Sequence, residues 1–216
     1  SWGGTRVEAW TSRDALESHE AGRTALQKYE GDLATYDSES AARKYDELLE
    51  VWERKKLRKP NAKKPKMKPA PAKNKNAPSG LYNAMIYPLI PFVIKGVIWY
   101  QGEANSKTEP DAFQYRNLLS SMIRNWREVW KQGDFPFYFV QLPAFASEKV
   151  YWPITRESMS EVNKRVSHTG MVVTVDLTGT KLHPKNKQDV GHRLALLALG
   201  DTYHKDIVFR GPEVAA

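Results

Sequence analysis

The chain has 216 residues, no cysteine and a formal net charge of +8, from 33 basic and 25 acidic side chains. This length fits one domain with some elaboration, and a hydrophobic content of 41% excludes a fully disordered chain. The lack of cysteine excludes disulfides and thiolate metal sites. No apolar run approaches the roughly 20 residues of a membrane span, and the first residues show no signal-peptide pattern.

The chain opens with Gly3-Gly4-Thr5, and paired glycines can present backbone N–H groups to an anion or a developing oxyanion. A polar, helix-forming stretch then runs to about residue 56, with Ser12 as its expected N-cap. Apolar residues recur at three- and four-residue spacing on both sides of a break near 37–40. This pattern predicts an inserted helical hairpin over residues 13–56.

The positive charge is concentrated in residues 54–75. This segment holds 11 of the 33 basic residues and no acid, which leaves 22 basic against 25 acidic residues elsewhere, a balance of −3. Four prolines prevent a helix, so we expect a basic, flexible loop over residues 57–80. The alternative is a nucleic-acid tether, but residues 54–80 contain no aromatic side chain for base stacking. We therefore expect no nucleic-acid partner.

From residue 81 onward, short apolar runs alternate with amphipathic stretches. We expect strands at 93–99, 137–142 and 171–175, and helices at 111–130, 154–166 and 187–199. Such alternation indicates an α/β fold with a parallel sheet. Ligands of these sheets bind beyond the carboxyl ends of the strands, so the residues after each strand are the candidates for function.

Polar residues follow two of the expected strands. Gln101, Gly102, Glu103 and Asn105 come after the first strand, and the loop after the third contains Asp176 and His183. An acid and a histidine in one loop can form a general base and its orienting partner, although ordinary turns use the same residue types.

Other chemistry finds little support in the sequence. No cluster of His, Asp and Glu has metal-ligand spacing, so the sequence predicts no metal site. A serine nucleophile would usually lie in a Gly-x-Ser elbow, and none occurs in this chain.

Five blocks of the sequence stand out: SWGGTRVEAW at 1–10, LYNAMI at 81–86, GVIWYQGEAN at 96–105, FPFYFVQL at 135–142, and Asp176 followed by HPKNKQDVG at 183–191. In this order they resemble the sialate O-acetylesterase family of the SGNH (GDSL-like) hydrolases. The resemblance covers nearly the whole chain and implies a three-layer α/β/α fold. It also implies cofactor-free hydrolysis of acetyl esters on sugars, such as O-acetylated sialic acid or acetylated xylan, by a secreted or periplasmic enzyme.

The resemblance implies a role for each matching residue. His183 would be the general base and Asp176 a candidate to orient it. The oxyanion hole would use the Gly4 N–H and the Gln101 side chain, and the substrate pocket would include Gly102, Glu103 and Asn105. Many relatives carry Asp or Asn within three residues before the histidine, where this chain has Thr180-Lys181-Leu182.

The family's nucleophile lies in a Gly-Gln-Ser-Asn-Met segment that precedes the Trp-Gly-Gly-Thr block. We therefore expect a fragment that is inactive alone, with a partial hydrolase domain at 1–12 and 81–216 interrupted by residues 13–56 and 57–80. The alternative is a non-catalytic carbohydrate-binding pseudo-enzyme that keeps the pocket without the serine. The sequence predicts no particular oligomeric state.

Overall fold

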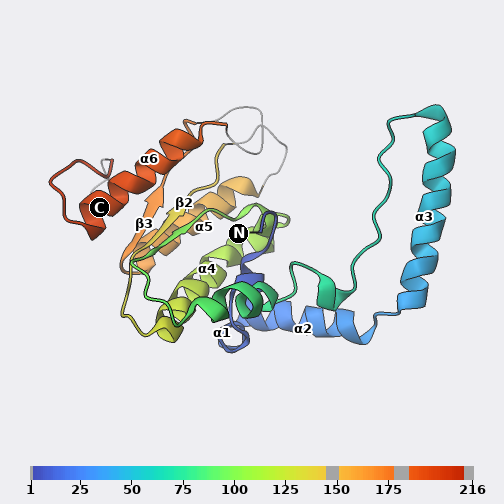
Figure 1. Cartoon of the computed structure of the whole chain (residues 1–216), viewed down its shortest axis with the longest axis horizontal. Helices are drawn as coiled ribbons and strands as arrows, with labels where there is room; N and C mark the ends of the chain where they lie inside the picture. Colours follow the sequence, from blue (N-terminus) through green and yellow to red (C-terminus); the bar gives the residue numbers. More distant parts are fainter. Residues whose placement is uncertain (1, 145–150, 178–184, 212–216) are drawn as a thin grey trace.

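The computed structural model describes residues 2–144, 151–177 and 185–211 (Figure 1). Its centre is a parallel sheet in the order β1-β2-β3, formed by Val97–Trp99, Phe137–Val140 and Thr169–Val172. The strands alternate with α4 (Glu109–Trp130), α5 (Trp152–Arg165) and α6 (Lys187–Leu197). The predicted α/β alternation is therefore confirmed.

The side chains of β2 alternate between the two faces of the sheet. Phe137 and Phe139 belong to the large apolar core that includes α4 and α5, whereas Tyr138 packs with Val172 and with Leu197 of α6. This period of two is that of a strand buried on both faces. Helices α4 and α5 thus cover one face and α6 the other, which gives three layers (Figure 1).

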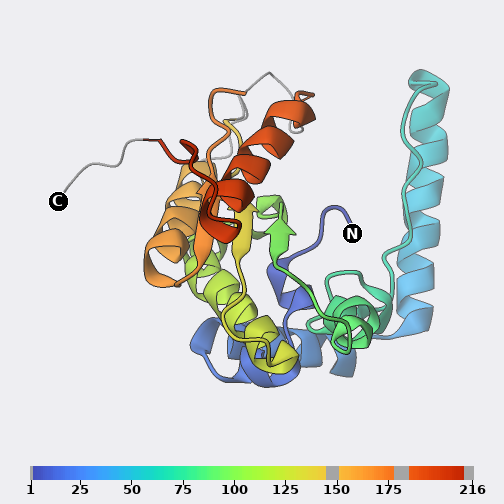
Figure 2. The same cartoon turned by 60° about the vertical axis from the view of Figure 1, so that its left-hand side comes forward.

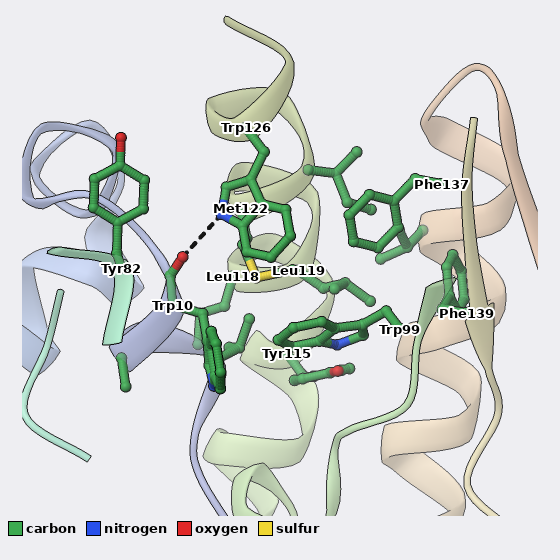
Figure 3. Close-up of a cluster of buried hydrophobic side chains, with 14 of the residues drawn as sticks. Trp10, Tyr82, Trp99, Tyr115, Leu118, Leu119, Met122, Trp126, Phe137 and Phe139 are labelled. Carbon is green, nitrogen blue, oxygen red and sulfur yellow. Dashed lines mark hydrogen bonds between the residues drawn. The ribbon is translucent and has the colours of Figure 1, made fainter. Parts of the chain in front are cut away.

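Indole rings connect the N-terminal residues 2–12 to the sheet and to α4. The Trp99 ring meets Trp10 and Trp126 edge-on, with centroids 5.7 and 5.8 Å apart. The Trp126 Nε1–H donates a hydrogen bond of 2.9 Å to the Trp10 carbonyl (Figure 3). Edge-on aromatic pairs add stability beyond their buried area. The first block is therefore part of the core of the sheet domain.

The N-terminal block forms a 3₁₀ turn at Val7–Trp10, followed by α1 (Arg13–Glu17) and α2 (Glu20–Ala34). The predicted cap is confirmed, because the Ser12 hydroxyl accepts a hydrogen bond from the Ala15 N–H. The predicted break is also found. The Asp37 carboxylate caps the next helix, α3 (Ser38–Arg58).

Two helices flank the break, as expected, but α3 turns away from α2 and stands apart from the sheet (Figures 1 and 2). None of its residues is buried. Its aromatic face is covered by the returning basic segment instead. The Trp52 Nε1–H donates to the Ala62 carbonyl at 2.8 Å, and the Lys56 and Lys64 ammonium groups lie 5.0 and 5.8 Å from the Trp52 ring centroid.

Some element bounds differ from the sequence-based ones. β1 covers only the end of the predicted 93–99 strand, because residues 93–96 form an irregular stretch in which the Ile94 N–H donates to the Gln132 side chain instead of to a neighbouring strand. Phe113 of α4 is 49% exposed, and its ring centroid lies 4.0 Å from the Arg116 guanidinium carbon. No helix within the described ranges is long and apolar enough to cross a membrane.

Candidate active site

The polar residues selected from the sequence lie at the carboxyl ends of the strands. The segment 101–105 directly follows β1, and Asp176 lies beyond the end of β3. The N-terminal segment 3–8 is bonded to the residues after β1 through the contacts described below. His183 lies outside the described residues.

The Gln101 side chain is fully engaged inside the protein. Its amide nitrogen donates to the Thr5 carbonyl at 2.9 Å and to Asn105 Oδ1 at 2.8 Å, and its Oε1 accepts from the Tyr115 hydroxyl at 2.9 Å. Burial raises the pKa of Tyr115, so this phenol stays a donor. Both amide hydrogens of Gln101 are used in this arrangement, and the side chain connects segment 3–8 to the end of β1.

Asn105 completes this connection from a fully buried position. Its Oδ1 also accepts from the Val7 N–H at 3.0 Å, and its Nδ2 donates to Glu8 Oε2 at 2.8 Å. Buried polar groups need such partners, because an unpaired one costs about 1–3 kcal/mol. Asn105 therefore supports the site from within the protein and presents no surface to a ligand here.

Three charged residues that the sequence pattern did not single out complete the network. The buried Glu8 carboxylate accepts from Arg6 Nε at 3.0 Å, and Arg6 Nη2 lies 2.7 Å from Asp111 Oδ1. Burial lowers the pKa of Arg6, but Glu8 and Asp111 outweigh it and the net pKa is raised. A signal was present, since Glu8 lies between the apolar residues Val7 and Ala9.

Glycines at two predicted site positions are required by the backbone. Gly4 has a φ of +69°, a conformation that favours glycine, and its N–H meets no acceptor within the described ranges. At Gly102 a Cβ would lie 2.9 Å from Met159 Cε and the φ is +155°. The Gly3-Gly4 turn is exposed, so its N–H groups are open to a ligand.

Asp176 is paired with Arg193 of α6. The Arg193 guanidinium bonds both carboxylate oxygens, at 2.7 and 2.5 Å, and also donates to the Val173 carbonyl at 2.6 Å. Hydrogen bonding from Arg193 lowers the pKa of Asp176 to about 2. The carboxylate is therefore ionised and held at the end of β3, in the loop that leads to His183.

The residues after β1 also meet the start of α6. The Lys187 ammonium lies 4.7 Å from the centroid of the Tyr100 ring. Burial and then the nearby Glu103 charge raise the pKa of Tyr100 to about 12. Glu103 itself is half-buried. This contact brings the segment after β1 next to residues four positions beyond His183.

Comparisons with known proteins agree on one family. A profile described as carbohydrate esterase, sialic acid-specific acetylesterase, matches residues 72–199. The sialate O-acetylesterases of Mus musculus and Homo sapiens are each 30% identical over 98% of this chain, which covers 40% and 36% of those proteins. A carbohydrate acetylesterase structure from Xanthomonas citri matches with a TM-score of 0.67 and 32% identity, over 98% of this chain and 37% of that one. The chain thus spans about 40% of the length of these curated relatives.

Proposed function

The chain belongs to the carbohydrate esterase family of sialic acid-specific acetylesterases, and on this premise we propose that it forms part of a carbohydrate O-acetylesterase. One observation carries the proposal. A buried hydrogen-bond network fixes the exposed Gly3-Gly4 turn beside the carboxyl end of β1, where a parallel sheet binds its ligand. A turn with open N–H groups, held rigidly at such a place, suits the stabilisation of an oxyanion.

The reaction follows serine-esterase chemistry. A serine attacks the acetyl carbonyl while His183 takes its proton, and the Gly4 N–H stabilises the negative oxygen of the tetrahedral intermediate. The sugar alcohol leaves with the proton from His183. Water, deprotonated by the same His183, then releases acetate from the serine. No Gly-x-Ser occurs in the 216 residues, so we place this serine outside them.

Asp176 orients His183 in this proposal. Its contact with Arg193 supports the assignment, because the guanidinium bonds both carboxylate oxygens and fixes the position of this charged group. An ionised, immobile acid is what a histidine base needs to hold one tautomer and to stabilise its protonated form. Arg193 would then set how strongly Asp176 stabilises the protonated form of His183.

The residues after β1 divide into two roles. Both amide hydrogens of Gln101 are already used, so we propose that it serves the oxyanion hole by positioning segment 3–8, with Asn105 behind it. Glu103, half-buried and beside Tyr100, is the acceptor proposed to meet sugar hydroxyls. Because Gly102 has no side chain, the backbone of this loop can pass close to the Met159 side chain.

The direct test is acetate release from O-acetylated sugars by the full-length protein and its His183→Ala variant. Loss of the base should lower kcat by more than about 10³-fold while the fold persists. The exposed His192 on α6 offers a matched control, since His192→Ala removes an imidazole from the same region without touching the proposed site. Full activity in His183→Ala would contradict the assignment.

A second candidate is a carbohydrate-binding pseudo-enzyme, favoured by the absence of Gly-x-Ser from the chain. It predicts that the full-length protein binds O-acetylated sugars at equilibrium and leaves the ester intact. Calorimetric binding measured together with acetate release separates the two candidates. Turnover of the ester excludes the binding module, and saturable binding without turnover excludes the esterase.

A further inference from the structure

The end of the basic segment returns to the Gly3-Gly4 turn and is bonded to it. The Lys75 Nζ donates to the Gly3 carbonyl at 2.7 Å, although the two residues are 72 positions apart. The Arg6 N–H donates to Asn76 Oδ1 at 2.8 Å, and the Ser79 N–H donates to the Glu8 carbonyl at 3.0 Å. Residues 75–79 therefore run along the whole segment 3–8.

The contact of Lys75 falls on a particular peptide group. The Gly3 carbonyl and the Gly4 N–H belong to the same planar, trans peptide, so they point in opposite directions. A donor that fixes the carbonyl also fixes the direction of the N–H. Glycine on both sides would otherwise leave this peptide free to rotate.

The positive charge of Lys75 also makes the Gly4 N–H better suited to bind an oxyanion. A hydrogen bond from an ammonium group is roughly twice as strong as a neutral one. It draws electron density toward the carbonyl oxygen, which makes the N–H of that peptide a better donor, as in hydrogen-bonded chains that polarise one another. A Cβ on Gly4 would lie only 3.0 Å from the Lys75 Nζ, so the glycine also makes room for this cation.

We propose that Lys75 is a positioning residue of the esterase, one that orients and polarises the Gly3–Gly4 peptide so that the Gly4 N–H meets the oxyanion. This inference rests on the proposed function. It gives the basic segment a role in catalysis through a single lysine, while Lys64 helps to hold the segment along α3 through its contact with the Trp52 ring.

The test compares Lys75→Met, Lys75→Arg and the control Lys73→Met in the full-length protein. Loss of a direct oxyanion donor costs about 10²–10³ in rate, so loss of its support should lower kcat by about 10-fold. KM and the melting temperature should stay near those of the wild type, because the peptide acts in the transition state. Lys75→Arg keeps a cationic donor and should restore most of kcat. Lys73, an exposed residue of the same segment, should tolerate the change.

The outcomes separate this inference from the proposed function. If the wild type releases acetate, His183→Ala does not, and Lys75→Met keeps full kcat, the inference alone is overturned. It is also overturned if Lys75→Met lowers the melting temperature and Lys75→Arg fails to restore kcat, since Lys75 would then be structural. A wild type that releases no acetate overturns both.

Discussion

At the scale of single residues, the site depends on polar side chains that are buried rather than exposed. Asn105 bonds three partners, Val7, Gln101 and Glu8, and none of them has access to much water. The sequence placed Gln101 and Asn105 at the end of a strand, as found. Their inward orientation was not predictable, because it is set by backbone groups of segment 5–8, about 100 positions away.

Removal of the Asn105 amide should therefore destabilise the fold. Asn105→Ala leaves the Val7 N–H, one Gln101 N–H and one oxygen of the Glu8 carboxylate buried without their partner. We expect the free energy of unfolding to fall by about 2–4 kcal/mol. Urea unfolding of Asn105→Ala and of the exposed Asn117→Ala measures the difference, since among the described residues the Asn117 side chain bonds only Gln114 of its own helix. Equal stability of the two variants would contradict this network.

His19 should make stability depend on pH. Its Nδ1 caps α2 by accepting from the Gly22 N–H at 3.2 Å, and burial, followed by the charge of Arg23, lowers its pKa. A histidine whose folded pKa lies below the unfolded value of about 6.5 takes up its proton more readily when unfolded. Its contribution to stability is thus complete above that pH and is lost as the pH falls through the lowered pKa.

The check is His19→Asn, which keeps a capping acceptor but does not titrate. The loss of unfolding free energy between pH 7.5 and pH 5 should be smaller in this variant than in the wild type. His204→Asn, at an exposed position, serves as the matched control. If the unfolding free energy falls by the same amount between pH 7.5 and pH 5 in the wild type and in His19→Asn, His19 has no such role.

At the scale of elements, the alternation of strands and helices was predictable because each element carries its own apolar period. The packing of α3 was not. Its partner is a segment rich in lysine and proline without an apolar pattern, and the Trp52 indole meets this segment at the Ala62 carbonyl and the Lys64 ammonium group. Cation–π contacts of this kind leave no periodic signal in a sequence.

Trp52 should control how tightly the basic segment follows α3. Trp52→Ala removes both the hydrogen bond to Ala62 and the ring beneath Lys64, so residues near 63 should become better substrates for trypsin. We expect cleavage after Lys63 to be several-fold faster than in the wild type, followed by mass spectrometry over time. Leu57→Ala is the control, because Leu57 is 86% exposed. Unchanged cleavage in Trp52→Ala would show that the segment is held by other contacts.

At the scale of the molecule, the net charge of +8 comes from one segment, residues 54–75. The rest of the chain is slightly acidic, and the basic segment runs along α3, away from the sheet (Figure 2). Salt screens exposed charges beyond about 10 Å, so most of these lysines exert little field at the site. Lys75 is the exception, since it reaches the Gly3–Gly4 peptide directly.

In the proposed reaction, this chain supplies the base and the oxyanion donor for a serine that lies outside its 216 residues. The decisive experiment is to label the full-length protein with a fluorophosphonate, which reacts with activated serines, and to locate the adduct by peptide mass spectrometry. We expect a single adduct on a serine outside residues 1–216 that disappears in His183→Ala. An adduct on a serine within these residues, or labelling undiminished in His183→Ala, would contradict the proposed reaction.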